Sequence, residues 1–160
     1  MAGDADLRKL YERIISAIGA DDAGALDGLM SAGLVDHNPV PDQPPGREGF
    51  VFWMHSAHTS FPDMTGTIQD TVVEGNRIAG RVVWTGTHEG EFLGLPGSGR
   101  QLSMAAMHLV RFEDGVAVEW WGASDLLGAA MGLGARLEPG RAVPEERAPE
   151  PGWKSPCDRQ

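Results

Sequence analysis

Residues 65–88 read TGTIQDTVVEGNRIAGRVVWTGTH, two runs rich in Thr, Val and Ile with Gly75-Asn76 between them. Residues of these types favour extended strands, and a two-residue link between such runs is typical of a β-hairpin. We therefore predict strands over 65–74 and 77–88. From this stretch onward the sequence pattern repeats every two residues, as it does in β-strands. The interpretation of the flanking segments depends on this change of period.

Two more strands are predicted after the hairpin. A Gly-rich loop leads into residues 101–112, and Asp114-Gly115 separates that run from residues 116–124. Asp-Gly between apolar runs is among the strongest short-range hairpin signals. A short helix over 126–133 closes the domain, so we expect four antiparallel strands between residues 65 and 124.

The N-terminal part of the chain has helical periodicity instead. Apolar residues recur at spacings of three and four up to Gly19, namely Leu7, Leu10, Tyr11, Ile14, Ile15 and Ile18. We expect a second helix, capped by Asp21 or Asp22 with Leu26, Leu29 and Met30 on its apolar side, a short extended piece over 34–37, and a third helix over about 47–60. Helices followed by antiparallel strands indicate an α+β fold, with the helices on one face of a curved sheet around a cone-shaped cavity.

The composition indicates one acidic domain. The 160 residues include 13 Lys plus Arg and 23 Asp plus Glu, a formal net charge of −10. No basic cluster offers the positive footprint that nucleic acid requires, and no apolar stretch approaches the ~20 residues of a membrane span. The single Cys157 excludes an internal disulfide, and the charged first 20 residues lack a signal-peptide core. We therefore expect a cytoplasmic protein that handles a small molecule.

Residues 135–160 differ in composition from the domain predicted over residues 1–134. They hold five of the 11 prolines, and Trp153 is their one aromatic residue. A segment with so few large apolar side chains cannot offset the entropy lost on ordering. We expect a flexible C-terminal tail.

Four short motifs follow one another along the chain. They are His37-Asn38-Pro39, Phe61-Pro62-Asp63, Gly86-Thr87-His88-x-Gly90-x-Phe92-x-Gly94 and Glu119-x-Trp121-x-x-x-Asp125. In this order, over residues 7–134, they resemble the SnoaL-like polyketide cyclases, which have the nuclear transport factor 2-like fold. The resemblance implies a homodimeric enzyme of antibiotic or related secondary metabolism. Such an enzyme closes a ring by an intramolecular aldol reaction, without metal or cofactor.

The resemblance assigns the acid/base role to Asp125. An aldol closure requires a proton to be removed beside a carbonyl and delivered to the new alkoxide, and a carboxyl group with a raised pKa serves both steps. The alternative role of Asp125 is to cap the last helix. Ala123 stands where several relatives carry a histidine, which favours a less polar substrate or a different ring closure.

His108, on an otherwise apolar strand, is the second predicted catalytic residue; the alternative is a core histidine with its hydrogen bonds satisfied. If Asp114-Gly115 is a two-residue loop, His108 pairs with Trp121, and both share one face with Asp125. A three-residue loop would place His108 and Asp125 on opposite faces. The Asp-Gly sequence favours the first register.

An apolar pocket suited to a planar molecule is expected beside these residues. Asn38 either binds a substrate oxygen or braces its own loop. His55 and His58 lack a third ligand, so no metal site is predicted, and no Gly-rich loop is placed to bind a nucleotide cofactor. The predicted substrate-binding residues are Asn38, Trp53, Phe61, Trp84, Met104 and Trp121.

Two other functions are compatible with the sequence, because one fold hosts many activities. The first is another enzyme of the same family, such as a cycloaddition-type cyclase, an isomerase or a hydroxylase. The second is a non-enzymatic module for small-ligand binding or dimerisation. A homodimer through the outer face of the sheet is expected, with Trp120 at the interface.

Overall fold

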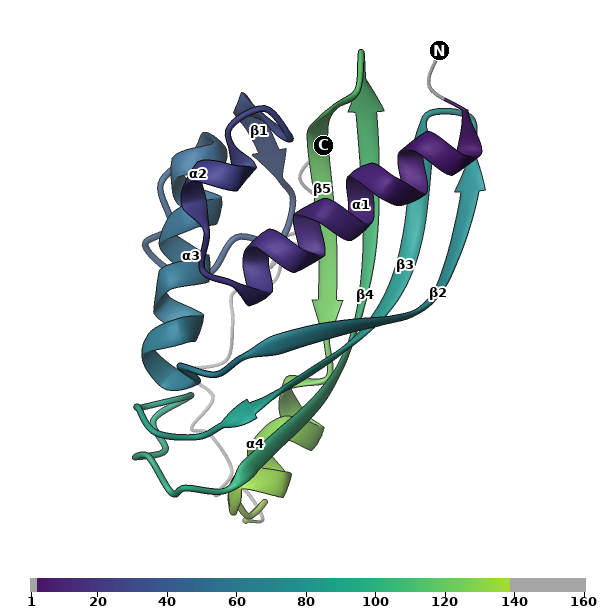
Figure 1. Ribbon diagram of the computed structural model, residues 1–160. Helices are drawn as coiled ribbons and strands as arrows, with labels where there is room; N and C mark the ends of the chain where they lie inside the picture. The colour runs from purple at the N-terminus through teal and green to yellow at the C-terminus, as the bar shows by residue number, and fades with distance from the viewer. Residues whose placement is uncertain (1–2, 139–160) are drawn as a thin grey trace, which may run out of the picture.

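The computed structural model describes residues 3–138, in which helices pack against a five-stranded sheet (Figure 1). The helices are α1 (Asp4–Gly19), α2 (Ala23–Leu26), α3 (Gly46–Ser60) and α4 (Leu126–Leu133). The strands are β1 (Met30–Asp36), β2 (Thr65–Glu74), β3 (Arg77–Thr87), β4 (Gln101–Glu113) and β5 (Val116–Ser124). None of the helices within the described range is long and apolar enough to cross a membrane. Of the predicted tail, residues 139–160 lie outside the described residues.

The α+β class and the four predicted strands are confirmed, but the sheet is mixed. Its order is β1-β5-β4-β3-β2, and the edge strand β1 runs parallel to β5. Figure 1 shows α1 lying across the strands and α3 running beside β1. The core fills the space between these helices and the inner face of the sheet. A purely antiparallel sheet was therefore a wrong expectation at one edge.

The second helix is shorter than predicted. Asp22 caps α2 by accepting a hydrogen bond from the backbone N–H of Ala25, as expected, but the helix ends at Leu26. Gly28 has a φ of 115°, a conformation that ends helices and favours glycine. Leu29 and Met30 are buried as predicted, but Met30 begins β1 rather than extending the helix.

The pairing of β4 with β5 contains a bulge that the sequence did not reveal. The Asp114-Gly115 turn is confirmed, because both residues have positive φ and Glu113 pairs with Val116. The register then shifts by one residue between Phe112 and Arg111, which leaves Val118 as the extra residue on β5. From this point the other face of β5 turns inward.

Candidate active site

A cavity of about 260 Å³ opens between the inner face of the sheet and α3. It combines titratable, amide and aromatic side chains, the mixture typical of small-molecule sites. Its lining comes from β1 and the loop after it, α3, β4, β5 and the start of α4. The lining residues are Asp36, Asn38, Val40, Gln43, Phe50, Trp53, His108, Trp120, Gly122, Ser124 and Leu126.

His108 is the histidine of this cavity and is held by Tyr11 of α1. The Tyr11 hydroxyl lies 2.8 Å from Nδ1 of His108, and the two side chains are almost entirely buried. Burial lowers the pKa of His108 to about 4 and raises the pKa of Tyr11 above its usual value. Near neutral pH both groups are therefore uncharged.

The hydrogen bond from Tyr11 also fixes which nitrogen of His108 carries the proton. The Tyr11 hydroxyl has no other partner within residues 3–138, so it satisfies its O–H by donating to Nδ1. A neutral imidazole that accepts at Nδ1 carries its hydrogen on Nε2. Nε2 of His108 has no hydrogen-bond partner, and it is not fully buried, because His88 Nε2 is the one side-chain nitrogen within residues 3–138 that is both fully buried and unpartnered. Since His108 lines the cavity, its Nε2 reaches the cavity.

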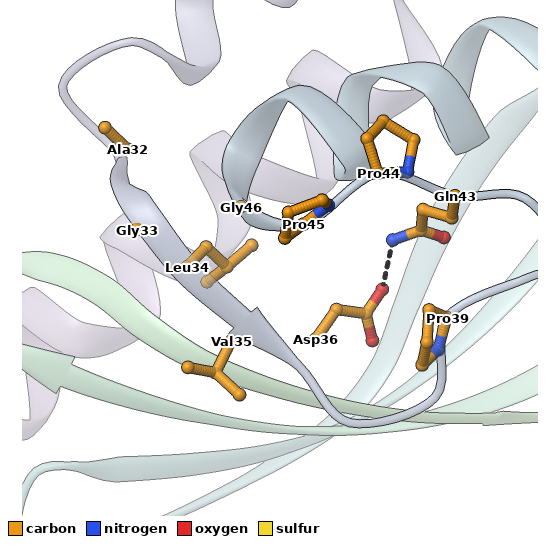
Figure 2. Close-up of a pocket in the computed structure, with 10 residues that line it drawn as sticks. All are labelled: Ala32, Gly33, Leu34, Val35, Asp36, Pro39, Gln43, Pro44, Pro45 and Gly46. Atoms are coloured by element: carbon orange, nitrogen blue, oxygen red, sulfur yellow. Dashed lines mark hydrogen bonds between the residues drawn. The ribbon is translucent and has the colours of Figure 1, made fainter.

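Asp36 and its neighbours form the opposite side of the cavity. The carboxylate of Asp36 accepts hydrogen bonds from the backbone N–H of Asn38 at 3.0 Å and from Nε2 of Gln43 at 2.9 Å. Figure 2 shows the second of these bonds, at the edge of an apolar groove of about 590 Å³ that Asp36 also lines. Asn38 in turn accepts a hydrogen bond from the backbone N–H of Gly122 at 3.1 Å.

Only part of the predicted site lies at this cavity. His108, Asn38 and Trp53 line it. Phe61 and Trp84 are buried in the core, and Met104 packs half-buried against that core. None of these three is among the residues that line the cavity.

The expectation that His108, Trp121 and Asp125 share one face is wrong. The bulge pairs His108 with Gly122 and turns Trp120 inward, where it is 4% exposed. Trp121 stacks on His37 on the outer side, with ring centroids 4.1 Å apart. Trp120 is therefore a cavity residue and cannot be the exposed interface residue that was predicted.

Asp125 has the geometry of a helix cap. It is the N-cap of α4, and its Oδ1 accepts a hydrogen bond from the backbone N–H of Gly128 at 2.8 Å. Its side chain is exposed and lines a shallow hollow with Arg81 and Met107 rather than the cavity of His108. The catalytic role of Asp125 stays a prediction.

The sequence does not identify several residues of the site. Phe50 and Asp36 line the cavity, and Tyr11 holds His108 from the core, but the sequence pattern predicts only helical core positions for Tyr11 and Phe50 and an extended piece for Asp36. The one signal for Asp36 was its position next to the His37-Asn38-Pro39 motif. No cluster of three or more His, Cys, Asp or Glu side chains within residues 3–138 could hold a metal ion.

The comparison with known proteins agrees with this geometry. The sequence pattern of the SnoaL-like polyketide cyclases matches residues 6–133. The chain belongs to this family. The resemblance noted in the sequence is thus confirmed, and with it the NTF2-like fold. No curated protein shows significant sequence similarity to the chain.

Solved structures similar to this SnoaL-like chain come from several Streptomyces species. TsrD of Streptomyces laurentii is 29% identical, with a TM-score of 0.78 over 85% of this chain and 100% of its own. IdmH of Streptomyces antibioticus, described as a proposed polyketide cyclase, is 34% identical, with a TM-score of 0.72 over 81% and 99%. AclR of Streptomyces galilaeus, described as a proposed hydroxylase, is 26% identical, with a TM-score of 0.72 over 82% and 98%.

The lowered pKa of His108 predicts how stability depends on pH. The folded pKa of about 4 lies below the ordinary 6.5, so the unfolded chain binds more protons between these values. The contribution of His108 is present above pH 6.5 and is lost as pH falls toward 4. Urea unfolding should show a loss of about 2 kcal/mol from this residue between pH 7 and pH 5. His108→Gln should remove that part of the pH dependence; an unchanged dependence would contradict the assignment.

Proposed function

We propose that this protein catalyses the aldol-type ring closure of a polyketide-type substrate, without a cofactor, in the cavity that His108 lines. The net reaction is an isomerisation. One C–H bond beside a carbonyl breaks, one C–C bond forms to a second carbonyl, and the proton returns to the new alkoxide oxygen. Since no atom is gained or lost, the reaction needs no co-reactant.

The buried pair of Tyr11 and His108 is the observation that carries this proposal. A neutral imidazole with Nε2–H directed into the cavity donates a hydrogen bond to a carbonyl oxygen, and this bond strengthens as negative charge develops on the enolate. The aromatic rings of Phe50, Trp53 and Trp120 suit a planar conjugated group. Ligand sites commonly measure ~300–1,000 Å³, so this small cavity favours a single reacting ring or chain end.

A synthetic linear 3,5,7-trioxooctanoyl thioester, whose C2 can close a six-membered ring on the C7 carbonyl, tests the proposal by mass spectrometry. The wild-type protein should yield a cyclic product of equal mass, or of that mass less one water. His108→Gln should slow the conversion about tenfold, which is less than the usual loss of an oxyanion donor because glutamine keeps an N–H.

Two other outcomes of this experiment would contradict the proposal. A product that gains one oxygen atom would identify a hydroxylase, the activity proposed for AclR. Saturable binding without any product would identify a ligand-binding module.

The homodimer stays part of the proposal, with a revised interface. The outer face of the sheet carries Leu109 and Trp121, both half-buried, and Met107, which is 52% exposed. Apolar side chains gathered on one face favour association. Light scattering should give twice the mass of the 17.1 kDa chain, and Met107→Glu should shift it toward the monomer. A monomeric wild-type protein at micromolar concentration would contradict this prediction.

A further inference from the structure

We infer that Asp36 is the carboxylate that removes the substrate proton and returns it during ring closure. This inference rests on the proposed function and names the base of that same site. It departs from the sequence-based assignment of Asp125, because Asp36 lines the cavity of His108 and Asp125 does not.

The strand pairing places Asp36 and His108 on the same face of the sheet. Asp36 of β1 pairs with Trp120 of β5, and His108 of β4 pairs with Gly122 of β5. Side chains of paired residues point to the same face, and so do those of residues two apart on one strand. Asp36 and His108 therefore flank β5, two strand spacings or about 10 Å apart across the sheet and two residues or about 7 Å apart along it.

Gly122 leaves the space between these two side chains open. A Cβ on Gly122 would lie 3.2 Å from Nε1 of Trp120 and 3.7 Å from Cδ2 of His108, so any side chain there would extend into the cavity. A substrate carbonyl and its α-carbon fit between the carboxylate on one side and the imidazole on the other. The geometry therefore matches a base and an oxyanion donor acting on neighbouring atoms.

The segment that carries Asp36 is held firmly against β5. The backbone N–H of His37 donates to the carbonyl of Trp120 at 2.9 Å, and the side chain of Asn38 accepts from Gly122. The bonds from Gln43 and Asn38 then orient the carboxylate, which still has lone pairs for a proton. A base in a fixed orientation loses little freedom when it reacts.

The proton transfers balance with Asp36 alone. Its carboxylate takes the α-proton, and the electron pair of that C–H bond forms the enolate, whose oxygen accepts a hydrogen bond from Nε2–H of His108. The enolate carbon attacks the second carbonyl, a C–C bond forms, and an alkoxide develops. The Asp36 carboxylic acid then protonates the alkoxide and is restored as carboxylate.

Deuterium exchange into phenylacetone isolates the proton-transfer step from ring closure. This ketone has one aromatic ring, and its α-protons exchange slowly near neutral pH without a catalyst. We expect Asp36→Asn to slow the protein-dependent exchange, followed by NMR, by a factor on the order of 10²–10⁴. Binding of phenylacetone and the Tm should change little. The matched control is Asp42→Asn, an exposed position with a φ of 63° that asparagine tolerates, and it should exchange at the wild-type rate.

Two further variants test the role of Asp36. Gln43→Met distinguishes catalysis by Asp36 from a role in holding its loop, and Asp125→Asn tests whether Asp125 is the base instead. Gln43→Met removes the hydrogen bond that Nε2 donates to Asp36 and the one that Oε1 accepts from the backbone N–H of Val40, but it keeps the carboxylate. The variant should therefore lose less than tenfold. A loss as large as that of Asp36→Asn would show that Asp36 only holds the loop. Exchange that survives Asp36→Asn but is abolished by Asp125→Asn would overturn the inference and support Asp125. A wild-type protein that neither exchanges nor cyclises would refute the proposed function itself.

Discussion

Gly122→Leu is expected to abolish turnover while the protein stays folded. The leucine side chain would project between His108 and Trp120, where the substrate carbonyl is proposed to lie. Gly122 has no positive φ, so a branched side chain adds no backbone strain in a strand. We expect kcat/KM for the trioxooctanoyl thioester to fall at least about 100-fold, equivalent to about 2.7 kcal/mol of transition-state binding.

Gly132→Leu is the matched control for this variant. Gly132 is exposed on α4, and beyond its chain neighbours and the backbone of its own helix no atom lies within 4 Å of the position that a Cβ would take. The same substitution there should leave turnover unchanged. If Gly122→Leu retained turnover within a factor of ten, the substrate would not occupy the space between His108 and Trp120.

Gly80→Ala is expected to cause the largest loss of stability. Gly80 pairs with His108 in the sheet, and a Cβ on Gly80 would overlap the ring and hydroxyl of Tyr11. Overpacking costs about 1–3 kcal/mol, and a displaced buried hydrogen bond costs about as much again. Together they should lower the Tm by roughly 10 °C in a domain of this size. Calorimetry would measure this change, and a Tm within about 2 °C of wild type would contradict it.

Two comparisons attribute this loss to the contact with Tyr11. Gly132→Ala, in the open helical position described above, should raise stability by about 0.5–1 kcal/mol, the opposite sign for the same substitution. In a Tyr11→Leu background, Gly80→Ala should cost much less, because the ring that it overlaps has been shortened. Additive effects in this double-mutant cycle would show that the damage lies elsewhere.

Most of the fold could be predicted because its signals are local. Gly75-Asn76 and Asp114-Gly115 mark the hairpins, and β5 and α4 were predicted to the residue. Only the end of the edge strand β1, residues 34–36, was predicted as extended, because Ser31-Ala32-Gly33 has no strand pattern of its own. Its conformation depends on pairing with β5, more than 80 residues away along the chain.

The candidate site was harder to predict than the fold, because one residue of register decides it. The Asp114-Gly115 turn correctly predicts the first pair of β4 and β5, Glu113 with Val116. Nothing in the sequence of residues 116–118, however, indicates the extra residue in β5. Without that bulge, the inward tryptophan would be Trp121, as was expected. Asp36 was missed for a related reason, since only its pairing with Trp120 places it beside the cavity.

The bulge at Val118 also has an evolutionary consequence. Loss of that one codon would remove the bulge but keep every later pair of the ladder, because Glu119 would follow Ala117 directly and still face Arg111. Trp120 would stay in the cavity, and Gly122 would still face His108. A lineage could thus lose the extra residue by a single in-frame deletion without exchanging the walls of the cavity. Relatives that lack one residue between the Asp-Gly turn and Trp120 should therefore accept the same molecules.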